Sequence, residues 1–90
     1  MAQQTIVQPY NSDMIEKISQ AAQNHKMVRL VYRDSKGSRS VRRVEPYEIK
    51  DGGLFAHDPL KESIRFFKLS RIVKATPTTK DFTPRWPMKL

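Results

Sequence analysis

The chain contains no cysteine among its 90 residues. A disulfide framework and a thiolate metal site are therefore excluded, and packing alone must stabilise the fold. No apolar run approaches the about 20 residues that a membrane span needs, and the basic start and apolar middle of a signal peptide are missing. These absences predict a soluble, cytoplasmic protein with no membrane partner.

The sequence also lacks the residue patterns of catalytic and metal sites. Its two histidines, His25 and His57, lie far apart without carboxylates at metal-ligand spacing, so we expect no metal and no other cofactor. There is no glycine-rich phosphate loop and no pair of carboxylates, and the candidate nucleophiles Ser63 and Ser70 have no base near them. We therefore predict that the protein is not an enzyme.

Acidic residues are few relative to basic ones. The chain has 17 Lys and Arg against 9 Asp and Glu, a formal net charge of +8. Such an excess attracts polyanions, and nucleic acid is the first candidate partner. The plain alternative is a basic protein whose charge only keeps it in solution.

The apolar pattern predicts one helix near the N-terminus. Residues 1–11 are polar and aperiodic, which is typical of a flexible arm. Ser12 or Asp13 can then cap a helix that runs to about residue 26. Three apolar residues form a narrow stripe on this helix, so the helix should pack on another element: Ile15, Ile18 and Ala22.

Alternating apolar residues predict five short strands after the helix. Turn residues separate these segments, and Pro46 marks an edge, bulge or bend in the second of them. This spacing predicts a mainly β fold, a small and strongly bent five-stranded antiparallel barrel. We expect an arm at 1–11, the helix and barrel at 12–76, and a proline-rich tail without regular structure at 77–90. The predicted strands are 27–34, 39–50, 54–57, 64–72 and, after a brief break, 72–77.

Several motifs resemble the WYL domain, an Sm or SH3-like barrel of bacterial transcription regulators and their phage and defence-system relatives. The resemblance runs from about Ile18 to Pro84 and is strongest in the segment 64–72. The tripeptide that names the family corresponds to Gly52, Gly53 and Leu54, so two aromatic side chains are missing. The matching residues are Arg65, Phe67, Leu69, Arg71 and Ile72, then Arg43, Val44, Glu45 and Pro46, then Tyr32, Phe82 and Pro84.

The resemblance implies a domain that senses or binds an effector, with single-stranded DNA or nucleotides as the best-supported class. Regulators of this family usually carry a winged helix-turn-helix ahead of the domain and another domain behind it. Only one helix precedes the barrel here, so we expect a stand-alone module that does not read operator DNA with a recognition helix.

Arginines of the predicted barrel are the first candidates for binding nucleic acid. On a strand, Arg65 and Arg71 share one face, and their planar donor forks match phosphate oxygens. Arg43 joins this patch because it matches the family pattern. The alternative is that one arginine pairs with Glu45 or Asp58 and orients a turn.

Lysine and ring side chains complete the candidate site. We expect Lys68 and His57 to contact phosphate or base, although a histidine before Asp-Pro also stabilises turns. Tyr47 and Phe55 offer stacking faces, against the alternative that the phenylalanines fill the core. Trp86 either packs back on the barrel or is an exposed anchor for a partner protein.

Two functional hypotheses remain open. The first is a WYL-like regulatory module that binds nucleic acid, single-stranded by preference, or a nucleotide-like anion, through the basic patch. The second is a protein-interaction module of phage or mobile-element origin that docks on an acidic host regulator or enzyme. In either case the barrel can form homo-oligomers through its strand edges.

Overall fold

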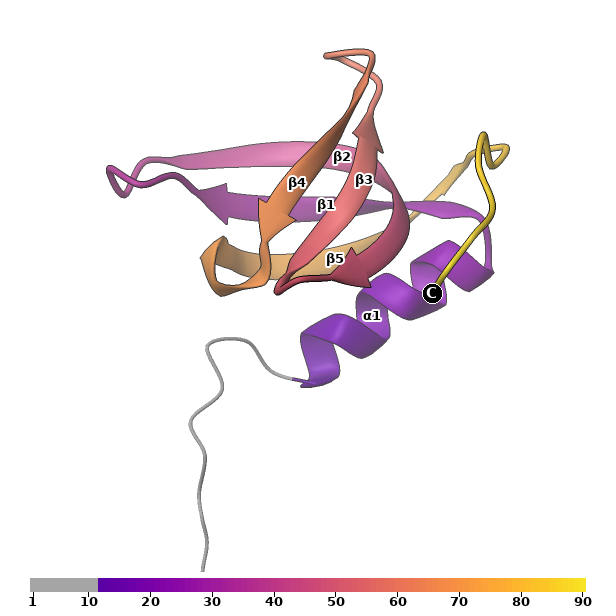
Figure 1. Cartoon of the computed structure of the whole chain (residues 1–90), viewed down its shortest axis with the longest axis horizontal. Helices are drawn as coiled ribbons and strands as arrows, with labels where there is room; N and C mark the ends of the chain where they lie inside the picture. The colour runs from indigo at the N-terminus through magenta and orange to yellow at the C-terminus, as the bar shows by residue number, and fades with distance from the viewer. Residues whose placement is uncertain (1–11) are drawn as a thin grey trace, which may run out of the picture.

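The computed structural model describes residues 12–90, and Figure 1 shows their arrangement. The predicted arm at 1–11 lies outside the described residues. The elements in chain order are α1 (Ser12–Gln23), β1 (Lys26–Arg33), β2 (Arg39–Lys50), β3 (Gly53–Asp58), β4 (Ser63–Lys68), the short 3-10 helix η1 (Leu69–Arg71) and β5 (Ile72–Asp81).

Helix α1 confirms the predicted apolar stripe. Ile18 and Ala22 are buried and Ile15 is partly buried, while Met14 and Ala21 widen the stripe. This face packs against β5, β1 and β2, below the sheet in Figure 1. The helix ends where His25 adopts a positive φ of 53° and its amide donates to the carbonyl of Ala22.

The five strands form one antiparallel sheet in the order β4-β3-β2-β1-β5. The prediction of a mainly β fold with one helix is confirmed, although the curled sheet does not close between β4 and β5. Strand β2 pairs first with β1 and then with β3, and its pairing shifts between Pro46 and Glu48. The predicted irregularity at Pro46 is therefore a β-bulge that turns one half of the sheet over the other.

Two predicted boundaries are wrong. The segment 64–72 is not one strand, because β4 ends at Lys68 and η1 follows it. Arg65 and Arg71 therefore do not share a strand face. The predicted irregular structure after Pro77 is also contradicted, since β5 continues to Asp81. An edge strand tolerates a proline because one of its sides needs no hydrogen-bond partner.

The main core lies between the curled sheet and α1. Alternate residues of β1 and β3 point into it, as the two-residue period of a strand requires, and β2 contributes Val44. No helix among residues 12–90 has the length and apolarity of a membrane span. The fully buried members of the core include Ile18, Val28, Leu30, Val44 and Leu54.

Leu54→Ala is expected to lower the free energy of unfolding by about 3 kcal/mol, because it removes a fully buried side chain and leaves a cavity. Urea denaturation followed by circular dichroism measures the change. Leu60→Ala, at the exposed tip of the β3–β4 hairpin, is the control and should stay within about 0.5 kcal/mol of wild type. Equal losses in the two variants would contradict this assignment of the core.

Candidate functional site

Strand alternation turns a row of arginines toward the outer face of the sheet, away from the core. Across β1 and β2, Arg29 lies opposite Arg43 and Arg33 lies opposite Arg39. Val31 and Val41 form the pair between them. We call the four arginines 29, 33, 39 and 43 the arginine ladder. Like charges directly opposite each other destabilise a strand pair, so this arrangement carries an electrostatic cost.

Nothing in the described chain offsets this cost. Among residues 12–90, no acidic side chain forms an ion pair with any arginine of the ladder. Arg33, Arg39 and Arg43 are exposed, and Arg29 is partly exposed. The ladder therefore presents unneutralised guanidinium groups to solvent.

An open groove of about 1230 Å³ runs beside the ladder and has Arg29 and Arg43 in its lining. Residues 78–85 and the hairpin residues Pro59 and Leu60 line it as well. Met27, Val41 and Phe82 give it an apolar portion. The groove thus combines cationic groups with apolar surface and with two carboxylates, Glu45 and Asp81, which form ion pairs.

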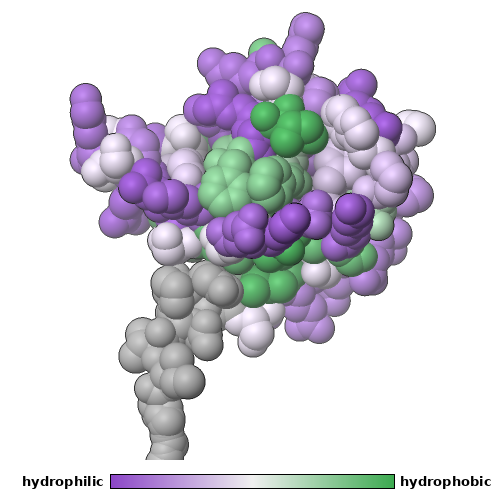
Figure 2. Space-filling view, viewed as in Figure 1, coloured by the Kyte–Doolittle hydropathy of each residue, from purple (hydrophilic) through white to green (hydrophobic). Residues whose placement is uncertain are grey.

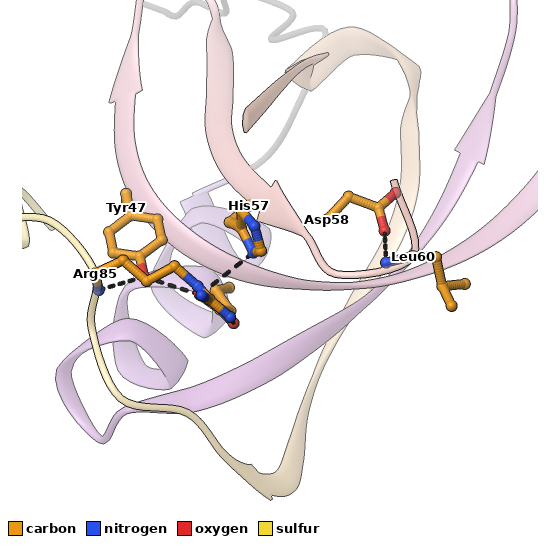
Figure 3. Close-up of polar contacts among 6 residues, drawn as sticks. Tyr47, His57, Asp58, Leu60 and Arg85 are labelled. Atoms are coloured by element: carbon orange, nitrogen blue, oxygen red, sulfur yellow. Dashed lines mark hydrogen bonds and ion pairs between the residues drawn. The ribbon is translucent and has the colours of Figure 1, made fainter. Parts of the chain in front are cut away.

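A buried carboxylate beside this groove ties the C-terminal segment to the sheet (Figure 3). Glu45 is only 3% exposed. It accepts hydrogen bonds from Arg85 Nε at 3.1 Å and Arg85 Nη2 at 3.3 Å, and from the hydroxyl of Tyr47 at 2.9 Å. The backbone amide of Arg85 donates back to the Tyr47 hydroxyl at 2.9 Å. Glu45 raises the pKa of Arg85, so this arginine is neutralised within the fold.

His57 and Asp58 lie on β3 next to this cluster. His57 Nδ1 is 3.6 Å from Glu45 Oε1 and has no hydrogen bond within the described chain. Asp58, almost fully buried, pairs with Arg42 Nη1 at 3.4 Å and accepts from the amide of Leu60 at 3.0 Å. Residues 12–90 contain no group of three His, Cys, Asp or Glu side chains that would hold a metal ion.

The three predicted phosphate-binding arginines do not form one patch. Arg43 lines the groove beside the ladder. Arg65, exposed on β4, lines a separate groove of about 410 Å³ with Arg39 and Arg42. Arg71 is partly buried on η1 and lines neither groove.

The other predicted side chains are partly exposed and partly buried, and they do not form one site. Lys68 is exposed at the end of β4, where its amide donates to the hydroxyl of Tyr32 at 3.2 Å. Tyr47 and His57 are buried, so neither presents a free stacking face. Trp86 packs edge-on against Tyr47 with ring centroids 5.3 Å apart, yet it stays 45% exposed. It therefore folds back on the sheet and still offers an accessible ring edge.

The sequence interpretation missed two features of this region. It offered a pair between Glu45 and Arg65 or Arg71 only as an alternative, and Arg85 makes the pair with Glu45 instead. Arg29 and Arg33 were not among its candidate residues, although pairing the two strands across the turn at Gly37 places each of them opposite another arginine. The equal spacing of four residues within each pair, 29 to 33 and 39 to 43, is the signal that predicts the ladder.

The sequence of this chain matches a known family of protein domains. The WYL domain family matches residues 13–77. The chain belongs to the WYL family. The resemblance drawn from the segment around Arg65 is thereby confirmed.

A solved structure resembles this WYL domain closely. It is that of proteasome accessory factor B/C (PafBC) of Arthrobacter aurescens, with a TM-score of 0.77 and 26% sequence identity. The match covers 91% of this chain but only 14% of the PafBC chain. No curated protein matches the sequence.

Arg85→Ala is expected to lower the urea midpoint of unfolding, because the buried Glu45 carboxylate would keep only the Tyr47 hydroxyl as a hydrogen-bond donor. Urea denaturation measures it. Lys80→Ala removes an exposed positive charge from the same segment and should change stability by less than about 0.5 kcal/mol. An unchanged midpoint in the Arg85 variant would show that the ion pair adds nothing.

Alkaline pH should destabilise the protein through Tyr47. Burial, the largest cause, and the bond to Glu45 raise the pKa of this hydroxyl above 10.0 in the folded chain. The folded state holds the proton more tightly, so the stabilisation is complete below pH 10.0 and is lost as pH rises through the raised pKa. Stability measured against pH should fall less steeply above pH 10 in Tyr47→Phe than in wild type. Parallel curves would contradict the assignment.

Proposed function

We propose that this WYL domain is a non-enzymatic regulatory module that binds nucleic acid, single strands by preference, through the arginine ladder and the groove beside it. The observation that carries the proposal is the pair of directly opposed arginines, Arg29 and Arg43, with no acidic partner in residues 12–90. An arrangement that costs stability in isolation is favoured when an anion neutralises it.

Phosphate is the anion that fits best. A guanidinium presents a planar fork of donors that matches two phosphate oxygens, and two facing forks hold one phosphate from both sides. The net charge of +8 attracts a polyanion from a distance. Arg39 belongs to the ladder and also lines the second groove, so Arg65 extends the cationic surface.

The apolar part of the groove favours a single strand over a duplex. Unpaired bases make apolar and stacking contacts that a duplex hides, while the backbone lies along cationic groups. Reading duplex DNA through the major groove commonly uses a helix-turn-helix, and α1 is the only α-helix in residues 12–90 and packs on the sheet. A nucleotide-like effector would make the same two kinds of contact over a smaller area: its phosphate with cationic groups and its base with apolar surface.

Family membership supports the regulatory part of the proposal. The similar domain in PafBC forms a small part of a much longer protein that is named as an accessory factor. We extend that role to this chain as a module that acts in the cytoplasm on, or in response to, nucleic acid.

The second candidate is a module that docks on an acidic protein. Two exposed apolar side chains beside the groove support it, Trp86 and Leu60. Docking of this kind would depend weakly on salt, whereas phosphate binding depends on it steeply.

Arg29→Ala/Arg43→Ala is expected to weaken binding of a labelled oligo(dT) at least tenfold in fluorescence anisotropy. On a single strand, each neutralised phosphate adds about 0.7 to the magnitude of the slope of log affinity against log salt. If each of the two arginines neutralises one phosphate, the magnitude of this slope should be smaller by about 1.4 in the double variant. A duplex of the same length should bind wild type more weakly than the single strand.

Lys17→Ala/Lys89→Ala removes the same charge from α1 and the C-terminal segment, and it should keep most of the affinity. Circular dichroism confirms that both double variants fold. Equal affinity of the two variants would show that binding follows net charge and not the ladder. Binding of wild type that does not change with salt would favour the docking module.

A further inference from the structure

A second part of the outer face, on β3 and β4, is aromatic. Phe55 and Phe66 lie opposite each other, with ring centroids 4.9 Å apart and ring planes at 55°. Phe66 remains 42% exposed even with this partner. Figure 2 shows hydrophobic residues at the centre of this face, bordered by hydrophilic ones.

Gly53 gives the Phe66 ring its place. A Cβ atom at position 53 would lie 2.2 Å from Phe66 Cζ and 2.3 Å from Cε1, so any other residue would push the ring away. The outer end of the ring therefore rests on the backbone of β3. Position 53 corresponds to the second residue of the family's Trp-Tyr-Leu tripeptide, and Phe66 brings an aromatic ring to this place from the neighbouring strand.

Two lysines flank this ring. Gly53 pairs with Lys50 on one side and with Lys68 on the other, and strand alternation turns both side chains to the face that carries Phe66. Both lysines are exposed, and neither forms an ion pair with an acidic side chain of residues 12–90. The nearest acidic residues along the chain are Glu48, opposite Phe55, and Asp51 in the turn.

We propose that Phe66 is a stacking platform for a nucleobase and that Lys50 and Lys68 bind the adjoining phosphates. This inference rests on the proposed function and names the part of the surface that contacts bases. An exposed ring fixed from below and bordered by cations is the combination with which proteins hold single strands without reading sequence.

The charge of the surface favours nucleic acid over a protein as occupant of this platform. The ring lies between two unpaired lysines on a chain of net charge +8. Strand β2 carries both Arg43 of the ladder and Lys50 of the platform, on the same outer face. Arg85 and Trp86 lie against Glu45 and His57 on this face, so a single strand bound at both sites would pass over these two residues.

The experiment compares oligo(dT) with an oligonucleotide of equal length whose central positions are abasic. Both strands carry the same phosphates, so the ratio of their affinities isolates the contribution of the bases. Wild type should bind oligo(dT) about tenfold more tightly than the abasic strand, the size expected for stacking of one base on one ring. Phe66→Leu should lower this ratio, with its affinity for the abasic strand unchanged.

Ile64→Ala is the matched control. Ile64 lies on the same strand and the same face, and it is 42% exposed like Phe66, but it has no ring. This variant should keep the tenfold ratio. Gly53→Ala is a second test, because it displaces the ring without removing it, and it should lower the ratio as well.

The possible failures are distinguishable. If Phe66→Leu keeps the tenfold ratio of affinities while Arg29→Ala/Arg43→Ala weakens binding as expected, the platform is wrong and the proposed function stands. If Ile64→Ala loses the ratio as fully as Phe66→Leu, the face is a general apolar docking surface and the platform is overturned. If wild type binds neither strand, the proposed function fails and the platform fails with it. Circular dichroism of every variant confirms that the comparison is made on folded protein.

Discussion

The shape of the molecule depends on β2, the strand that both halves of the sheet share. It pairs with β1 up to Val44 and with β3 from Glu45, and the bulge around Tyr47 lies in its second half. The bulge adds one residue, so the outward positions change from odd numbers, such as Arg43, to even ones, such as Lys50. Without it, Lys50 would point toward the core and Ile49 toward solvent. Lys50 shares a face with the ladder and with Phe66 because of this one inserted residue.

The sequence predicted the features that depend on neighbouring residues. The stripe around Ile18 gave α1, the apolar alternation gave the strands, and Pro46 marked the irregularity in β2. The family resemblance was also correct, because its motif around Arg65 is local. The division of the arginines was not predictable in the same way, because it depends on where β4 ends and on the register between β1 and β2.

Contacts between residues that lie far apart in the sequence were the second feature that the sequence did not predict. The sequence interpretation left open a pair between Glu45 and Arg65 or Arg71, which are nearer to it in the chain than its partner is. The partner is Arg85, 40 residues away, and it reaches Glu45 only because the segment after β5 folds back over the sheet. Burial of Tyr47 and His57 follows from the same fold-back, and it removed two rings that the sequence offered as stacking faces.

Under the proposed function, the opposed arginines link folding to ligand binding in both directions. Repulsion between Arg29 and Arg43 lowers the stability of the β1–β2 hairpin, and an anion held between them relieves it. The free energy released when the anion relieves this repulsion stabilises the occupied protein against unfolding. The same free energy raises the affinity of the folded site for the anion. The proposed function therefore implies that, among polyanions, the stability of this domain depends on the ions around it as well as on its own packing.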